Sequence, residues 1–133
     1  MSYLLDTCVV SDFFKKIPLV VKHFEAVSPD KIHISSITVM EIEYGLRLHL
    51  EREKKIRPLW KSLLNHIHVV FYSPKCAIAS ASIKASLKNT GLSIGSYDVL
   101  IAGTSLAHNM IMVTSNIGEF KRIPEITVED WRN

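Results

Sequence analysis

The sequence predicts an α/β fold in which one mainly parallel sheet of four to five strands carries helices on both faces. Short apolar runs alternate along the chain with longer segments whose apolar residues recur at helical spacing. This alternation is typical of βαβ units, whose sheets are parallel and covered on both sides. The chain of 133 residues contains no linker, repeat or low-complexity tract, which indicates a single domain over residues 1–133.

The first elements are expected to be a strand and two helices. Tyr3–Leu5 is a short apolar run that ends at an acid, and Cys8–Phe14 then repeats apolar residues at helical spacing. A second helix is expected over Leu19–Val27, because Pro18 is favoured at a helix start. The segment Ser28–Asp30, with its central proline, ends that helix in a turn.

The middle of the chain is expected to contain two strands that flank two helices. Ile32–Ile34 alternates as a strand does, and Thr38–Leu50 places its apolar residues on one side of a helix. The strongly charged segment Glu51–Leu64 is expected to be helical as well. His66–Phe71 is rich in β-branched residues and is therefore predicted to be a strand.

The last part of the chain repeats the pattern of helix and strand. A long alanine-rich helix is expected over Pro74–Gly91, with proline at its start and glycine at its end. A second helix is expected over Ser96–His108. Strands are predicted at Met110–Val113 and Ile126–Val128, which brings the sheet to five strands.

Composition excludes several classes of protein. The net charge of +3 permits a nucleic-acid partner without demanding one. Two cysteines, Cys8 and Cys76, are too few and too far apart for a disulfide framework, and we expect Cys8 to be packed and not catalytic. The chain shows neither a secretory signal nor an apolar run long enough for a membrane span. We expect a cytoplasmic protein with no membrane partner.

Four acidic residues stand where predicted strands end or predicted helices begin. Asp6 follows the first strand, and Glu41 lies in the first turn expected for the Thr38 helix. Asp98 lies in the first turn of the helix opened by Ser96. Glu119 follows the Met110–Val113 strand. Ligands of parallel α/β folds bind outside the carboxyl ends of the strands, which makes these four positions the candidate site.

Each acid also has a purely structural interpretation. Asp6 can cap the first helix, and Asp98 is favoured near a helix start by the helix dipole. Thr38–Glu41 and Asn116–Glu119 both have the sequence of a capping box. Taken singly, these interpretations are the more common ones.

The four acids together favour a metal site, because their neighbours are apolar. Carboxylates that converge in a partly buried cleft repel one another, and a divalent cation removes that repulsion. Mg²⁺ and Mn²⁺ prefer oxygen ligands of this kind. Magnesium held by few carboxylates commonly meets phosphate oxygens, so the chemistry that fits is hydrolysis of a phosphodiester by water that the metal activates.

Four segments carry a resemblance to a known family. They are Leu4–Thr7, Ser36–Gly45, Ile94–Ala102 and Val113–Phe120, which follow one another in the order and at the spacing of the PIN domain. The chain resembles most closely the VapC toxins of bacterial VapBC toxin–antitoxin pairs, down to the closing Val128–Trp131. The resemblance covers essentially the whole chain and implies a PIN-like three-layer α/β/α sandwich.

The resemblance also implies a function. It implies an endoribonuclease that depends on Mg²⁺ or Mn²⁺, cuts tRNA or rRNA, and is neutralised by a cognate VapB-type antitoxin. It further implies a homodimer and a toxin–antitoxin hetero-oligomer. By this match Asp6, Glu41 and Asp98 form the acidic core, with Asp6 and Asp98 as metal ligands. Many PIN domains carry Asp where Asn116 stands, so Glu119 is assigned the fourth acidic role and Asn116 a supporting one. Glu41, Glu119 and Asn116 remain further candidate ligands, and one metal is as compatible with the sequence as two.

Further side chains are candidates for binding RNA. The hydroxyls of Thr7 and Ser115 fit a supporting role near the phosphate or a helix cap equally well. The stretch from Arg47 to Lys61 holds six basic and two acidic residues, a local charge of +4 that either steers RNA or forms a solvated helix face. The basic candidates for RNA contact are Arg47, Arg52, Lys54, Lys55, Arg57, Lys84 and Lys88.

Two other functions compete with the nuclease. A catalytically inactive PIN-like binding module would use the acidic cleft only to dock a basic protein partner or RNA, and Asn116 in place of an acid keeps this alternative open. A phosphoryl-transfer fold that uses an aspartyl phosphate is disfavoured, because a phosphatase of that type would need a second acid at Cys8.

Overall fold

The computed structural model describes residues 1–133 and contains one five-stranded sheet, as the sequence predicts. All of its neighbouring strands are parallel, and their order is β3-β2-β1-β4-β5. The strands are β1 (Tyr3–Leu5), β2 (Ile32–Ser35), β3 (His68–Val70), β4 (Ile111–Val113) and β5 (Val128–Glu129).

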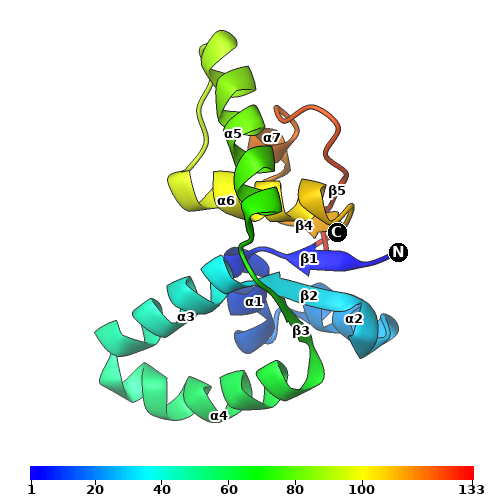
Figure 1. The fold of residues 1–133 in the computed structure, drawn as a ribbon. Coiled ribbons are helices and arrows are strands. Elements are labelled where there is room, and N and C mark those ends of the chain that lie inside the picture. Colours follow the sequence, from blue (N-terminus) through cyan, green and yellow to red (C-terminus); the bar gives the residue numbers. More distant parts are fainter.

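Helices cover both faces of this sheet, which gives the expected three layers (Figure 1). One layer holds α1 (Thr7–Phe14), α2 (Pro18–Ala26), α3 (Ser36–Leu48) and α4 (Leu50–His66). The opposite layer holds α5 (Pro74–Asn89), α6 (Ser96–Ala107) and the short α7 (Ile117–Phe120). A 3-10 turn, η1 (Pro29–Lys31), precedes β2. No helix is both long enough and apolar enough to cross a membrane.

Side chains alternate across the sheet and so divide the core into two clusters. Leu5 and Ile34 point into a cluster with α1, α3 and α4 that is centred on Trp60, which is fully buried. Leu4 and Met112 point to the other face and pack against α5, α6 and α7. The period of two along each strand thus buries both faces, as it must in a parallel sheet covered on two sides.

The start of α3 differs from the predicted start. The helix begins at Ser36 and not at Thr38, because the Ser35 hydroxyl at the end of β2 accepts a hydrogen bond from the Thr38 N–H at 3.1 Å. Ser35 is therefore the cap, and the predicted Thr38–Glu41 capping box is wrong. Glu41 consequently lies in the second turn of α3 and not in the first.

Two strand bounds also differ from the prediction. His66 is the last residue of α4, since the Ile67 N–H still donates to the Leu63 carbonyl, and β3 begins only at His68. β5 is shifted toward the C-terminus relative to Ile126–Val128. Its position is fixed by β4, because backbone bonds to the residues before and after Val128 set the pairing.

The strand order creates a reversal point at the middle of the sheet. From β1 the chain builds outward through β2 and β3 and then returns to the other side of β1 with β4. Leu5 is in register with Val113, so the residues that follow these strands, Asp6 and Thr114, leave the sheet side by side. Crevices at such reversal points are the usual ligand sites of open α/β sheets.

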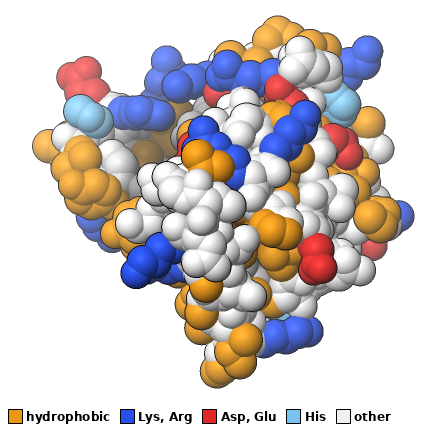
Figure 2. All heavy atoms as spheres, turned by 90° about the horizontal axis from the view of Figure 1, so that it is seen from above, with side chains coloured by type: hydrophobic (Ala, Val, Ile, Leu, Met, Phe, Trp, Pro, Cys, Tyr) orange, Lys and Arg blue, Asp and Glu red, His pale blue; other side chains and the backbone are white.

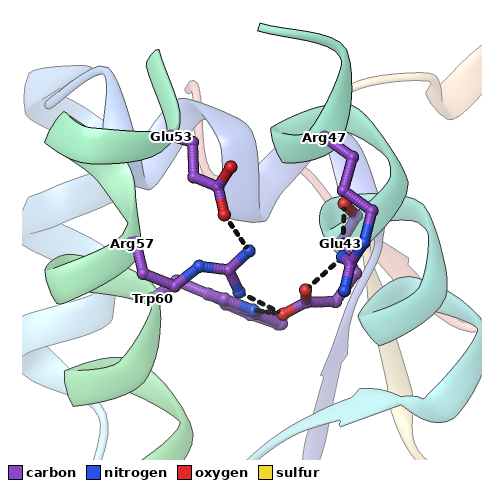
Figure 3. A network of polar contacts seen from close by, with 5 residues as sticks. All are labelled: Glu43, Arg47, Glu53, Arg57 and Trp60. Carbon is purple, nitrogen blue, oxygen red and sulfur yellow. Dashed lines mark hydrogen bonds and ion pairs between the residues drawn. The ribbon is translucent and has the colours of Figure 1, made fainter. Parts of the chain in front are cut away.

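A polar network ties α3 to α4 and makes these helices one arm (Figure 3). The Glu43 carboxylate accepts hydrogen bonds from Arg57 at 2.6 Å, Arg47 at 2.5 Å and the Trp60 indole N–H at 2.7 Å. Arg57 also pairs with Glu53 at 2.7 Å. These interactions, the Arg57 hydrogen bond above all, lower the pKa of Glu43 to about 2.

Substituting Glu43→Gln is expected to destabilise the arm. The variant loses two charge-assisted pairs but keeps an acceptor for Trp60, so we expect a loss of about 1 to 2 kcal/mol and a melting temperature about 5 °C lower. Because the pKa of Glu43 is lowered, this contribution is present above about pH 4.5 and fades as the pH falls toward 2. Thermal unfolding from pH 3 to 7 measures it. Glu53→Gln, which removes one pair, is the control, and equal effects of the two variants would contradict the central place of Glu43.

Candidate functional site

Asp6 is the most deeply buried acid of the candidate site. It directly follows the central strand β1, and its side chain is 3% exposed. Its Oδ1 accepts a hydrogen bond from the Val9 N–H at 2.9 Å, so Asp6 caps α1 as the sequence predicts. Burial raises the pKa of Asp6 to about 6, against the opposing hydrogen bonds from Thr114 and Val9, and the charge of Asp98 adds to the rise.

Asp98 lies in the first turn of α6, as predicted, and is half-buried. Its pKa is also raised to about 6, first by partial burial and then by the charges of Glu119 and Glu41. The charge of Asp98 in turn raises the pKa of Asp6, so Asp98 interacts electrostatically with each of the other three predicted acids. The structure therefore brings Asp6, Glu41, Asp98 and Glu119 to one region of the molecule.

The hydroxyl of Thr7 orients Glu41. Thr7 Oγ1 donates a hydrogen bond to Glu41 Oε1 at 2.7 Å and lies 3.1 Å from the hydroxyl of Thr38, which is buried. Thr7 is the first residue of α1, directly after Asp6, so one short segment places a buried carboxylate and the hydroxyl that positions a second one. The hydroxyl of Thr7 thus contacts the acidic cluster, whereas the cap of α1 is Asp6.

Glu119 connects α7 to the start of α6. Its Oε1 accepts a hydrogen bond from the Gly95 N–H at 3.0 Å, and its Oε2 accepts one from the Asn116 side-chain amide. Asn116 stands at the cap of α7 without a side-chain capping bond, so the predicted Asn116–Glu119 capping box is wrong. A Cβ on Gly95 would lie 3.0 Å from Asp98 Oδ2, which shows how closely this backbone passes Asp98.

Thr114 is a site residue that the sequence reasoning missed. It is fully buried, its hydroxyl lies near enough to Asp6 to lower the pKa of that carboxyl, and the hydroxyl accepts a hydrogen bond from the Asn116 N–H at 3.0 Å. The neighbouring Ser115, which with Thr7 is predicted to support the site, has an exposed side chain that makes none of the structure's hydrogen bonds. The signal for Thr114 was its place after a strand parallel to β1, which sets it beside Asp6.

Cys8 differs from its expectation. It is exposed and not packed, because α1 turns this position outward while Val9 and Val10 enter the core. Partial removal from water and the nearby carboxylates, Asp6 first among them, raise the pKa of its thiol to about 11. A thiol with this pKa stays protonated at neutral pH, which is unsuited to nucleophilic catalysis.

The donor set of the site fits a hard divalent cation. The atoms of the site that could bind a metal ion are carboxylate, hydroxyl and amide oxygens. None of the structure's four ion pairs involves the four acids of the site. No three of the carboxylate, imidazole or thiolate groups surround a common point as a ready-made metal centre. Mg²⁺ suits such a site because it is usually held by one or two carboxylates together with several waters.

The basic candidates fall into paired and unpaired groups. Arg47 and Arg57 are held by Glu43 and Glu53, whereas Arg52 takes part in none of the structure's ion pairs. Figure 2 shows lysine and arginine side chains at several places on one face, some of them adjoining along its upper edge, among apolar and acidic ones. The exposed side chains without an ion pair are Arg52, Lys54, Lys55, Lys84 and Lys88. For these five residues, and for Arg47 and Arg57, contact with RNA stays a prediction.

Comparison with known proteins agrees with this architecture. Residues 3–126 match the model of the PIN domain family. The chain is 32% identical over 131 residues to the tRNA(fMet)-specific endonuclease VapC of Salmonella typhimurium and 33% identical over 139 residues to ribonuclease VapC2 of Rickettsia felis, with 98% of each chain covered in both cases. Among solved structures, it superposes on VapBC2 of Rickettsia felis bound to a promoter DNA fragment with a TM-score of 0.90 at 33% identity, covering 98% of this chain and 99% of the other.

A match over almost the whole length excludes a similarity confined to one motif. The family model spans the strands β1 to β4 and every acid of the candidate site. The two relatives are matched from end to end, and the fold superposes with the same completeness. The chain therefore belongs to the PIN domain family and, within it, to the VapC ribonucleases.

Proposed function

We propose that the chain is a divalent-metal-dependent endoribonuclease that acts as the toxin of a toxin–antitoxin pair. The observation that carries this proposal is the pair Asp6 and Asp98, whose pKa values are both raised to about 6 at the reversal point of a parallel sheet. A bound cation would offset the cost of holding such carboxylates ionised at neutral pH. The names of the VapC relatives support RNA as the substrate.

The side chains divide into ligands and groups that position them. Asp6 and Asp98 would hold Mg²⁺ or Mn²⁺, and Glu41 and Glu119 complete the negative cluster. Thr7 fixes Glu41, and Asn116 fixes Glu119, through the hydrogen bonds described above. When bound, the metal supplies a Lewis acid that activates water and offsets the charge of the phosphate.

The test uses purified protein and an in vitro transcribed initiator tRNA. We expect cleavage at discrete phosphodiesters in Mg²⁺ or Mn²⁺, and none when EDTA removes the metal, because four carboxylates without a cation repel the RNA backbone. Gel mapping of the 5′ and 3′ ends locates the cut. Cleavage that persists in EDTA would contradict metal dependence. An RNA that is bound but not cut in the presence of metal would favour the inactive binding module.

A small antitoxin is the proposed protein partner. The solved relatives from Rickettsia felis and Salmonella typhimurium are VapBC complexes bound to DNA. In this chain Met40, Tyr44 and Leu48 are exposed along one side of α3, and such exposed apolar stripes typically bind another protein. A cavity of about 540 Å³ between α5 and α6, bordered by Lys84 and Lys88, is a second candidate contact, for self-association. The proposed assembly is a homodimer within a toxin–antitoxin hetero-oligomer.

A further inference from the structure

A second, smaller cavity adjoins the acidic cluster. It has a volume of about 140 Å³ and lies between α1, α3 and α4, the helices of the layer that includes the arm. Thr7 and Glu41 form one of its walls, so the cavity and the acidic cluster share two side chains. We call it the arm pocket.

The arm pocket combines an apolar floor with a polar rim. Its floor is formed by residues of the core cluster on this face of the sheet, namely Phe14, Ile42, Leu46 and Ile56. Ser11 and Arg52 contribute a hydroxyl and a guanidinium to the lining. Arg52 takes part in none of the structure's ion pairs, unlike Arg47 and Arg57 of the same arm. Its charge is therefore available to a ligand.

The size of the arm pocket points to one part of a larger ligand. Pockets for whole small molecules typically measure about 300 to 1,000 Å³, well above the 140 Å³ found here. This volume suits a single planar group that belongs to a polymeric ligand, the rest of which is bound outside the pocket. The floor provides apolar contact for such a group, and Arg52 provides the fork of donors that recognises a phosphate.

We propose that the arm pocket binds the base of a nucleotide next to the phosphodiester that is cut. A nucleotide offers a planar apolar group together with a negative phosphate, which matches the floor and Arg52 at once. An apolar protein side chain would fill the floor but leave Arg52 without a partner. Proteins that read single-stranded RNA commonly take up unstacked bases in this manner. Because Glu41 belongs to both the pocket wall and the acidic cluster, a base in the pocket would belong to a nucleotide adjacent to the reacting phosphate.

Gly45 makes this proposal testable without damage to the fold. It lies in α3 and lines the arm pocket, and a Cβ built on it meets no atom within 4 Å. A larger side chain can therefore extend from the helix into the pocket. Replacing a glycine inside a helix also improves helix propensity, so the variants should be at least as stable as the unsubstituted protein.

The experiment combines Gly45 variants with abasic RNA. The substrate is a short hairpin that the unsubstituted protein cuts at one mapped phosphodiester, prepared intact and with an abasic nucleotide on either side of the cut. We expect the abasic change on one side to raise KM about tenfold for the unsubstituted protein. Gly45→Leu should raise KM for the intact hairpin by a similar factor, and the abasic change should then add less than twofold. Gly45→Ala should have a smaller effect of the same kind, and Ala81→Leu, at an exposed position of α5, serves as the control for added apolar surface.

Two results would overturn the arm pocket as a base site. The first is a KM of Gly45→Leu for the intact hairpin equal to that of the unsubstituted protein. The second is an abasic change that raises the KM of Gly45→Leu by the same factor as it raises the KM of the unsubstituted protein, on whichever side of the cut the base is removed. This inference rests on the proposed nuclease activity, but different results would contradict the nuclease activity and the base site. If the unsubstituted protein cuts no hairpin, the nuclease fails, and the same comparison is then made on RNA affinity by fluorescence anisotropy. Thermal unfolding of each variant shows that it is folded.

Discussion

Replacing Asp6 with asparagine is expected to abolish RNA cleavage while it stabilises the metal-free protein. Cleavage should fall by at least ~100-fold, because the variant removes the innermost carboxylate of the proposed metal site. At pH 7.5 the ionised Asp6 is unfavourable in the fold, since burial has raised its pKa from 3.8 to about 6. A rise of this size corresponds to about 3 kcal/mol. Asparagine also caps helices well and keeps an oxygen for the Val9 N–H.

We therefore expect the melting temperature of Asp6→Asn in EDTA to exceed that of the unsubstituted protein by about 10 °C. Calorimetry measures this, and cleavage of the initiator tRNA is assayed in parallel. The matched control is Asp12→Asn, a buried acid of the same helix that pairs with Arg132 through two hydrogen bonds of 2.7 Å. This variant should melt at a lower temperature and still cut RNA. A loss of stability in both variants would show that Asp6 is a structural cap alone.

Removing the metal is expected to make stability depend on pH in an unusual direction. In the folded chain Asp6 and Asp98 keep their protons up to about pH 6, whereas in the unfolded chain they lose them near pH 4. Between these values the folded state binds more protons, so the free energy of unfolding of the metal-free protein falls as the pH rises. Most small proteins gain stability over this range.

Excess Mg²⁺ or Mn²⁺ should reverse that loss. A cation at about 100 times its dissociation constant adds about 2.7 kcal/mol, which corresponds to roughly 10 °C in melting temperature. The gain should shrink below pH 6, because protons and the cation compete for the same carboxylates. Thermal unfolding from pH 4.5 to 8, with EDTA or with metal, measures both effects. Melting temperatures that do not change with the cation at pH 8 would exclude Asp6 and Asp98 as its ligands. Asp98→Asn should lack the gain from the cation and show a smaller fall with pH, because burial still raises the pKa of Asp6.

The sequence predicted the positions that depend on local pattern. Asp6 follows an apolar run and stands at a helix start, so both its strand and its capping role could be predicted from neighbouring residues. Asp98 was placed in the first turn of α6 for the same reason. Ser35 and Thr38 are both good caps, and propensity alone does not choose between them. The choice is made by β2, which extends to Ser35 and leaves that hydroxyl facing the start of α3.

Features that depend on contacts between distant elements were not predicted. The placement of Thr114 beside Asp6 requires the register of β1 against β4, which no local pattern encodes. The engagement of Arg47 and Arg57 by Glu43 likewise depends on how α4 packs against α3. A count of charges therefore treated the arginines of the arm as equivalent, whereas the fold leaves only Arg52 beside the acidic cluster.

The order of the strands also bears on what happens while the chain is being synthesised. β1 is made first but becomes the centre of the sheet, and its second edge stays open until residues 111–113 of β4 leave the ribosome. The cluster of acids likewise draws on positions 6, 41, 98 and 119, which span nearly the full length of the chain. A translation product that stops before Asp98 thus carries no complete centre. The proposed toxin becomes active only after the segment that carries the last of these acids has been made.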